Sequence, residues 1–400
     1  MENNKLVYLD NNATTMVDKE VLKAMEPYFV EDYGNPSSIY SFGGVAQKAI
    51  QQARTQVKEF LNAKNEKEIF FTGSGSESSN TAIKGVLDVD KTKKHIITTK
   101  VEHPCVLNLY QSLEKKGYKV DYIGVNSNGD LDLDELENAI GEDTALVSCM
   151  WANNETGVIF PIEKISQIVK SKNKDTKLFV DAVQAAGKIP IDVQAADIDL
   201  LGISGHKFHA PKGIGVLYAK SGTMFNPLVT GGHQERGKRA GTENVPYIVG
   251  IGKAAELAQA GLQHESTEVK RLRDKLESSI LKTVFNARLN SGYANRVPNT
   301  TNIGFEYVEG ELILLHLSDF GICASSGSAC TSGSLEPSHV LKAMGVPFTA
   351  LHGSIRFSLS RFTTEDEIDY VLAVLPRVID KLVNISPFQD ELAQLRAMKS

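Results

Sequence analysis

Ser204-Gly205-His206-Lys207-Phe208-His209-Ala210-Pro211-Lys212-Gly213 is a polar turn between two apolar runs, residues 200–203 and 214–219. Runs of this length predict buried strands, so the turn carries Lys207 at the end of a strand. A lysine amine there, with a serine and a histidine beside it, can form an imine with a carbonyl compound. The alternative is an ordinary solvated surface lysine.

A second strand-like run, residues 177–180, is followed by Asp181 and Gln184. Ligands of an open parallel sheet bind at the carboxyl ends of its strands, which is where both Asp181 and Ser204 fall. A carboxylate for a protonated ring nitrogen and a lysine for an aldehyde are the two protein groups that pyridoxal phosphate needs most. Together they predict a pyridoxal phosphate site, whereas Asp181 taken alone is also explained as a capping residue.

Composition limits the classes of function. The 400 residues are 42% hydrophobic with a net charge of −6, which predicts a large core divided over two or three domains. The sequence has no basic block or RNA-binding signature, so we expect no nucleic-acid partner. Its apolar stretches are short and residues 1–5 lack the apolar run of a signal peptide, so we expect no membrane association and a cytoplasmic location.

The four cysteines show neither a Cys-x-x-Cys pair nor zinc-site spacing, so we expect them to be mostly reduced and to hold no metal. Packing explains Cys149 and Cys323, which lie in apolar runs, and Cys105, which leads a helix. Cys330 differs because it lies in Ser326-Gly327-Ser328-Ala329-Cys330-Thr331-Ser332-Gly333. A thiol in such a segment is exposed and mobile, which suits a travelling nucleophile.

Apolar runs alternate with helical patterns over residues 69–220, which predicts a mostly parallel sheet covered by helices on both faces. The expected strands are 69–71, 95–99, 119–125, 145–151, 178–181, 200–204 and 214–219, and the expected helices include 78–87, 106–116 and 162–172. Residues 249–285 predict long helices with a weak break near Gly261. They lead into a smaller α/β domain with strands at 301–305 and 354–359 and helices at 311–317 and 365–383. We therefore expect an N-terminal segment 1–15 that packs with the small domain, a large domain 16–259 and a small domain 260–400.

Two Gly-rich segments are candidate anion sites. Thr72-Gly73-Ser74-Gly75-Ser76-Glu77-Ser78 joins a strand to a helix, so its small residues and free N–H groups suit a phosphate. The alternative is a plain helix cap made by Ser76 and Glu77. Residues 232–238 have P-loop spacing, but Arg239 replaces the Ser or Thr that binds magnesium and no strand precedes them. We reject a nucleotide site and interpret residues 239–242 as further phosphate donors.

Two other residues are candidates for the site. His103 follows the expected strand 95–99, where it could lie over a flat ring and move protons, or be a satisfied loop histidine. Arg356 lies within the β-like run 354–358, where its guanidinium needs a carboxylate partner. That partner is either a substrate carboxylate or an internal acid.

These motifs, in this order, resemble the pyridoxal-phosphate cysteine desulfurases of the NifS/IscS class, within the fold-type I aminotransferase superfamily, and NifS most of all. The resemblance covers essentially the whole chain through Tyr8-Leu9-Asp10-Asn11-Asn12-Ala13-Thr14-Thr15, Gly34-Asn35-Pro36-Ser37-Ser38, Asn153-Asn154-Glu155-Thr156-Gly157, Asp181-Ala182-Val183-Gln184, Ser204-Gly205-His206-Lys207 and the segment 326–337. The chain departs from the usual pattern of this family at Gly75-Ser76, where family members commonly have Ala-Thr. It also departs at Cys105, where a small apolar residue is common in the family.

The resemblance implies a role for each candidate. Lys207 carries the cofactor, Asp181 pairs with its ring nitrogen, Gln184 reaches its ring hydroxyl and His103 stacks on the ring. The remaining cofactor-binding residues are Gly75, Ser76, Asn154, Ser204, His206 and, from the other subunit of a homodimer, Thr242. Asn154 and Arg356 orient the substrate L-cysteine, and Lys207 and His103 carry protons. Cys330 attacks the substrate sulfur, becomes a persulfide and leaves alanine.

The resemblance also implies a sulfur acceptor. We expect an iron–sulfur scaffold protein, in nitrogenase cluster assembly rather than housekeeping supply, and no metal beyond transient contact of Cys330 with a cluster. A housekeeping desulfurase, a selenocysteine lyase or an aminotransferase of the same fold are the alternatives. A protein that carries sulfur without catalysis is a further alternative, which the complete cofactor set disfavours.

Overall fold

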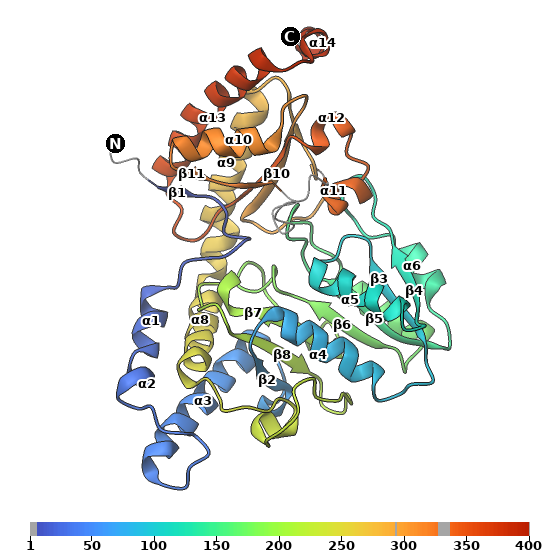
Figure 1. The fold of residues 1–400 in the computed structure, drawn as a ribbon, viewed down its shortest axis with the longest axis vertical. Coiled ribbons are helices and arrows are strands. Elements are labelled where there is room, and N and C mark those ends of the chain that lie inside the picture. The colour runs from blue at the N-terminus through green and yellow to red at the C-terminus, as the bar shows by residue number, and fades with distance from the viewer. Residues whose placement is uncertain (1–5, 293, 327–336, 400) are drawn as a thin grey trace.

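The structure is a computed structural model that describes residues 6–292, 294–326 and 337–399. Its larger body is built on a seven-stranded sheet (Figure 1). The strand order is β2 (Ile69–Thr72), β8 (Gly215–Ala219), β7 (Leu200–Ser204), β6 (Lys177–Asp181), β5 (Thr144–Met150), β3 (His95–Thr99) and β4 (Lys119–Ile123). The sheet is parallel from β7 to β4, and β8 pairs antiparallel with both β7 and β2. The predicted α/β class with a mostly parallel sheet is confirmed.

Helices cover both faces of this sheet, which is why its central strands are continuous apolar runs. One face packs on α4 (Gly75–Leu87) and α5 (Pro104–Glu114), and the other on α3 (Ser41–Phe60), α7 (Ile162–Lys172) and α8 (Val245–His264). Strand β6 shows the alternation, because Phe179 lies in the first of these cores and Leu178 and Val180 in the second. Smaller helices complete the body: α1 (Lys19–Met25), α2 (Pro27–Val30) and α6 (Leu133–Ala139).

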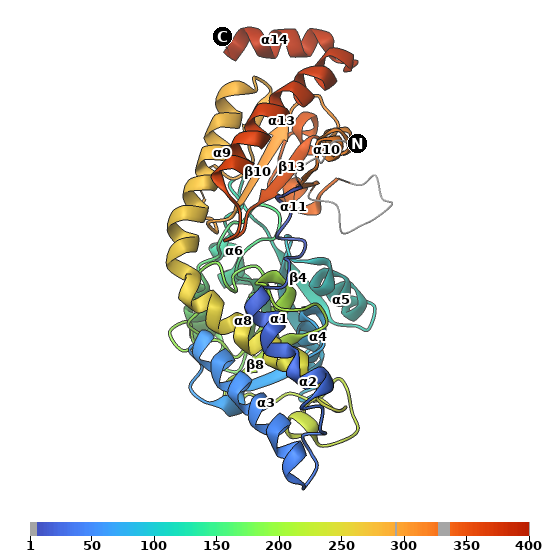
Figure 2. The same cartoon turned by 90° about the vertical axis from the view of Figure 1, so that its left-hand side faces the viewer.

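A long helix joins the two bodies (Figure 2). Helix α8 continues through a π-helical segment, Glu265–Val269, into α9 (Lys270–Thr283). The break predicted near Gly261 was wrong. A glycine costs a helix only about 1 kcal/mol, and the buried face of α8, which includes Ala254 and Ala258, more than offsets this by packing. The irregularity lies instead at Glu265, where one turn widens.

The smaller body has an antiparallel four-stranded sheet in the order β12 (Ser325–Ser326), β13 (Ser354–Ser358), β10 (Thr300–Phe305) and β9 (Ala287–Leu289). Its core also takes side chains from α9, α10 (Gly310–Asp319) and α13 (Glu365–Ile385). Helices α11 (His339–Ala343), α12 (Phe348–Leu351) and α14 (Gln389–Lys399) complete it. Val340 and Leu341 of α11 pack against the core of the larger body.

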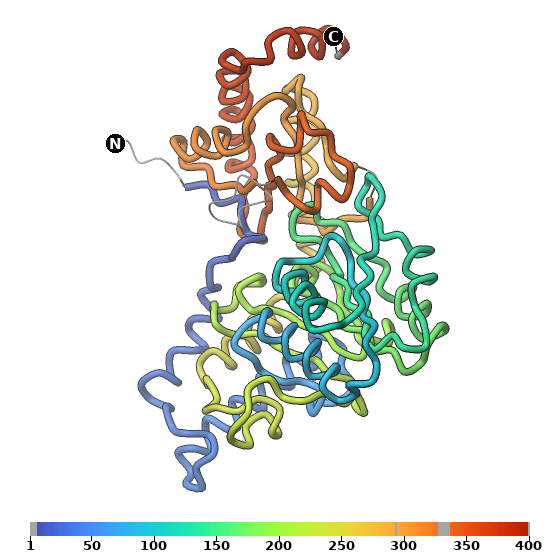
Figure 3. The backbone as a smooth tube through the Cα atoms, turned by 45° about the vertical axis from the view of Figure 1, so that its right-hand side comes forward, coloured from blue at the N-terminus to red at the C-terminus, as the bar shows by residue number. Residues whose placement is uncertain are grey.

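The N-terminal segment runs along the smaller body before it crosses to the larger one (Figure 3). Strand β1 (Val7–Tyr8) pairs in parallel with β11 (Ile322–Cys323), and Val7 and Leu9 are buried in the smaller body's core. The predicted domain limits at 15 and 259 stay a prediction. Among the described helices, none is long and apolar enough to cross a membrane.

Candidate active site

A cavity of about 290 Å³, the central pocket, lies at the carboxyl ends of the parallel strands. Its lining includes the predicted site residues Gly75, Ser76, His103, Asn154, Asp181, Gln184, Ser204, His206, Lys207 and Arg356. Thr242 does not line it and is exposed in the single chain. Cys330 lies outside the described residues. The structure thus brings together side chains from both bodies that are far apart in the sequence.

Lys207 lies on the short 3-10 turn Gly205–Lys207 between β7 and β8. The turn is tight: a Cβ on Gly205 would lie 2.9 Å from Ala210 Cβ, so only glycine fits. Lys207 Nζ donates to the carbonyl oxygens of Asn12 at 2.6 Å and Ala13 at 2.8 Å. The N-terminal segment therefore holds the amine at the pocket, a contact that the local sequence pattern did not predict.

Asp181 ends β6 and is buried at the bottom of the pocket. Its Oδ1 accepts a hydrogen bond from the Val183 amide at 3.0 Å. Burial raises the pKa of Asp181 to about 6, although the Val183 amide and the Lys207 charge act in the opposite direction. A buried carboxylate without a full counter-charge is suited to bind a cationic group, because a nearby positive charge restores its ionised state.

The predicted phosphate turn opens helix α4, and the cap differs from the predicted alternative. Ser74 is the N-cap, and its hydroxyl accepts the Glu77 amide at 3.1 Å. Glu77 folds back to the Gly73 amide and to Arg239, so Ser76 is not needed for capping. A Cβ on Gly75 would lie 3.1 Å from Ser204 Cβ. The glycine therefore lets the helix N-terminus come close to β7, where backbone N–H groups suit an anion.

His103 is the N-cap of α5, and its Nδ1 accepts the Cys105 amide at 3.2 Å. The proton of the neutral ring therefore lies on Nε2. Burial lowers the pKa of His103 to about 4, helped by the charges of Lys207 and His339. The other pocket histidine, His206, has its pKa lowered to about 4 by burial and Lys207. Both rings are uncharged at neutral pH.

Arg356 comes from β13 of the smaller body and closes the pocket from above. Its guanidinium donates to the Asn154 carbonyl at 2.9 Å and to Asp10 Oδ1 at 2.7 Å. Of the two partners that the sequence allowed for Arg356, the internal acid is present, and it is Asp10. Arg356 Nε is buried with no hydrogen-bond partner among the described residues. This orphaned donor belongs to a residue that lines the pocket, so Arg356 retains capacity for an anionic ligand.

Cys105 lines the pocket beside His103. Burial raises the pKa of its thiol to about 12, and the Asp181 carboxylate acts in the same direction. The thiol pKa values of Cys149 and Cys323 are also raised by burial. None of the three described cysteines is a thiolate at neutral pH.

The segment with P-loop spacing is a turn that anchors itself to the larger body. Glu235 and Arg236 have positive φ angles of 45° and 57°. Glu235 is buried and pairs with Arg54 at 2.7 Å. An acid at the centre of the turn is the opposite of what a nucleotide phosphate needs.

Comparison with known proteins identifies the family. The aminotransferase class-V family matches residues 7–371 of the chain. The chain is 58% identical to a cysteine desulfurase 2 of Trichormus variabilis, over 97% of this chain and 96% of the relative. It is 53% identical to the cysteine desulfurase NifS of Azotobacter vinelandii, over 96% and 94%.

Solved structures agree with the sequence relatives. A NifS-like protein is similar at a TM-score of 0.89 and 41% identity, covering 94% of this chain and 100% of the other. A NifS-like protein from Rickettsia africae is similar at a TM-score of 0.85 and 33% identity, covering 94% and 100%. The chain therefore belongs to the aminotransferase class-V family and, within it, to the cysteine desulfurases.

Proposed function

We propose that the chain uses pyridoxal phosphate, held covalently by Lys207, to convert L-cysteine to L-alanine, and that Cys330 takes up the sulfur as a persulfide. The observation that carries the proposal is that Lys207, Asp181 and Gln184 line one pocket together with the N-terminus of α4. Each group matches one part of the cofactor: the aldehyde, the ring nitrogen, the ring hydroxyl and the phosphate.

The residues present fit this cofactor. The missing Cβ of Gly75 leaves room at the start of α4, and the side chains of Ser76, Ser204 and His206 line the same end of the pocket. The carboxyl group of Asp181, with its pKa raised to about 6 by burial, favours a cationic ring nitrogen beside it. His103 is uncharged, as a residue stacked on a cationic ring has to be. Asn154 lines the pocket beside Arg356.

When bound, the cofactor withdraws electrons from the substrate Cα and makes its proton removable. The chain's own residues do the rest. Arg356 and Asn154 hold the substrate carboxylate, and the Lys207 amine and His103 carry protons to and from the substrate. The Cys330 thiolate attacks the substrate sulfur, so that a sulfur–sulfur bond forms as the carbon–sulfur bond breaks. The electron pair of the broken bond stays on the carbon, which is protonated to give alanine.

We further propose that the enzyme is a homodimer in the cytoplasm. Large apolar side chains on the α2–α3 side of the larger body are exposed, among them Val30 at 74%, Tyr33 at 68% and Ile39 at 104%. Exposed apolar patches of this kind mark protein interfaces. Thr242 is also exposed, which leaves it available to complete the partner's phosphate site. A monomer at working concentration would rule out this part of the proposal.

We propose an iron–sulfur scaffold protein as the sulfur acceptor, in nitrogenase cluster assembly. The likeness to a protein named NifS supports this, and the segment 326–337 that carries Cys330 provides the donor. The measurement is which scaffold accepts labelled sulfur from Cys330 fastest. Preference for a housekeeping scaffold overturns the nitrogenase assignment and leaves the desulfurase standing.

The cofactor proposal is tested by the visible absorbance of the purified protein. We expect a visible band that borohydride abolishes, with the reduced cofactor recovered on the peptide that contains Lys207. The variant Lys207→Ala should form no alanine from L-cysteine, while Lys212→Ala, on the same turn, should remain active. Turnover by Lys207→Ala near the wild-type rate would disprove the assignment.

A further inference from the structure

Lys188 is a buried lysine that the proposed reaction does not use. It lies four residues after Gln184, and 6% of its surface is exposed. Its Nζ donates to Gln184 Oε1 at 2.5 Å and to Asn12 Oδ1 at 3.1 Å. A buried ammonium is costly unless it is well partnered, and these two oxygens are its partners.

The contact decides which way the Gln184 amide points. The oxygen and nitrogen of a glutamine amide are alike in shape, but a lysine ammonium has no lone pair and can only donate a hydrogen bond. The atom that faces Lys188 is therefore the amide oxygen. Gln184 Nε2 donates one hydrogen to the Asn12 carbonyl at 3.0 Å, and its second hydrogen remains for the central pocket, which Gln184 lines.

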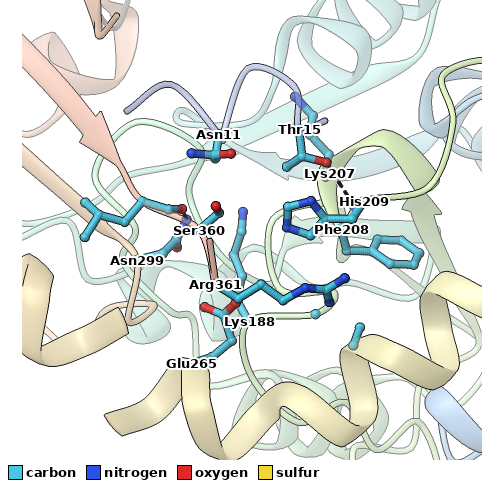
Figure 4. A pocket seen from close by; sticks show the side chains of 13 residues that line it. Asn11, Thr15, Lys188, Lys207, Phe208, His209, Glu265, Asn299, Ser360 and Arg361 are labelled. Atoms are coloured by element: carbon cyan, nitrogen blue, oxygen red, sulfur yellow. Dashed lines mark hydrogen bonds between the residues drawn. The ribbon is translucent and has the colours of Figure 1, made fainter. Parts of the chain in front are cut away.

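A second, smaller cavity of about 20 Å³ lies behind Lys207, where the two bodies meet. Lys188, Glu265 and Arg361 line it (Figure 4). It is large enough for about one water molecule. Glu265 comes from the π-helical segment of the connecting helix, and its Oε2 is buried with no hydrogen-bond partner among the described residues.

The charges around Lys188 oppose one another. Burial and the charges of Lys207 and Arg356 lower the pKa of Lys188 to about 7, while Glu265 acts in the opposite direction. Burial likewise raises the pKa of Glu265 to about 7, against the charges of Lys188 and Arg361. Glu265 is thus the acid that favours a charged Lys188. In this ammonium form Lys188 can only donate to Gln184.

We propose that Lys188 is a positioning residue, which holds the Gln184 amide with its N–H group toward the ring hydroxyl of the bound cofactor. This rests on the proposed function, because it requires pyridoxal phosphate in the central pocket. A donor at the ring oxygen stabilises the negative charge on that oxygen, so the oxygen interacts less with the protonated nitrogen through which Lys207 would hold the cofactor. Lys188 therefore lowers the pKa of that nitrogen.

The test is a pH titration of the visible absorbance of the holoenzyme. In Lys188→Met, which keeps an unbranched apolar stem but removes the donor, we expect the apparent pKa that governs the absorbance band to rise by about one unit, a tenfold change in proton affinity. Lys170→Met is the control, because Lys170 also donates two hydrogen bonds, to the Asp199 carboxylate and the Thr176 carbonyl, before the start of β6 and β7 and away from Gln184. It should titrate like the wild type.

A double variant separates positioning from charge. In a Gln184→Leu background, Lys188→Met should add no further shift, because Lys188 acts through Gln184. If Lys188→Met fails to fold, Lys188→Gln replaces it: its side chain is polar but one bond shorter, so it does not reach Gln184. An unshifted titration in these variants, or a shift that persists without Gln184, overturns the inference. A wild-type protein that shows no visible band refutes the proposed cofactor instead.

Discussion

The floor and the upper wall of the central pocket are built by different sheets. The floor residues come from the larger body: Asp181 and Ser204 end the parallel strands β6 and β7, and Lys207 lies on the turn after β7. The wall residues Ser325 and Arg356 belong to the antiparallel sheet of the smaller body, which has its own core. In the proposed reaction the cofactor chemistry therefore belongs to one sheet, whereas substrate binding depends on how the two bodies sit together.

The N-terminal segment links floor and wall. Asn12 Nδ2 donates to Thr300 Oγ1 of the smaller body at 2.8 Å, while the Thr15 amide donates to the His206 carbonyl of the larger body at 2.9 Å. Asp10 pairs with Arg356. One stretch of chain therefore fixes the position of Arg356 in the smaller body relative to Lys207 in the larger one.

The largest effect is expected from the variant Cys330→Ser, which separates cofactor binding at the floor from sulfur transfer. The floor should keep the cofactor's colour and its spectral response to L-cysteine, because neither requires the thiol. Sulfide release should fall by about three orders of magnitude or more, as is usual when a nucleophile is lost. Cys105→Ser is the control, and its buried, protonated thiol predicts near-normal activity. If only Cys105→Ser loses sulfide release, the nucleophile is Cys105 and not Cys330.

A smaller effect is expected from Arg356→Lys in the wall. Lysine keeps the charge but not the two-pronged contact with Asp10 and the Asn154 carbonyl. We expect KM for L-cysteine to rise about 10- to 100-fold, which corresponds to the roughly 1.5–3 kcal/mol of a hydrogen bond to a charged group. The cofactor spectrum should not change. If the spectrum shifts and KM does not, Arg356 affects the cofactor rather than the substrate. The division of roles between floor and wall would then be wrong.

The sequence predicted the strands of both the floor and the wall, for a physical reason. Strand β7 and helix α7 have the expected bounds, because a buried strand and an amphipathic helix each leave a local pattern. A pocket residue at the end of such a strand, such as Asp181, can therefore be placed from local pattern and strand order alone.

The contacts that were missed join residues that are distant in sequence. Asn12 meets Lys207 and Lys188 across more than half of the larger body's sequence, and no periodicity encodes this. The motif around Asn12 was recognised only as part of a family resemblance. The false break at Gly261 has a similar origin, since the packing that keeps the helix intact is tertiary.

The smallest effect, on stability alone, concerns Glu102, a buried acid next to His103. It is buried, its Oε1 accepts the Thr99 hydroxyl and the Met150 amide, and burial together with Asp181 raises its pKa to about 8. The folded protein therefore holds a proton that the unfolded chain loses above its ordinary carboxyl pKa. Between those two pKa values this group makes the free energy of unfolding fall as pH rises, by at most about 1.4 kcal/mol per pH unit.

The variant Glu102→Gln should remove that slope. In denaturant titrations of the cofactor-free proteins, its free energy of unfolding should therefore rise relative to that of the wild type from pH 5 to pH 8. Glu135→Gln, at an exposed acid of α6, is the control and should keep the wild-type slope. Equal slopes in Glu102→Gln and wild type would show that Glu102 is ionised in the folded state and that its surroundings are more polar than its burial implies.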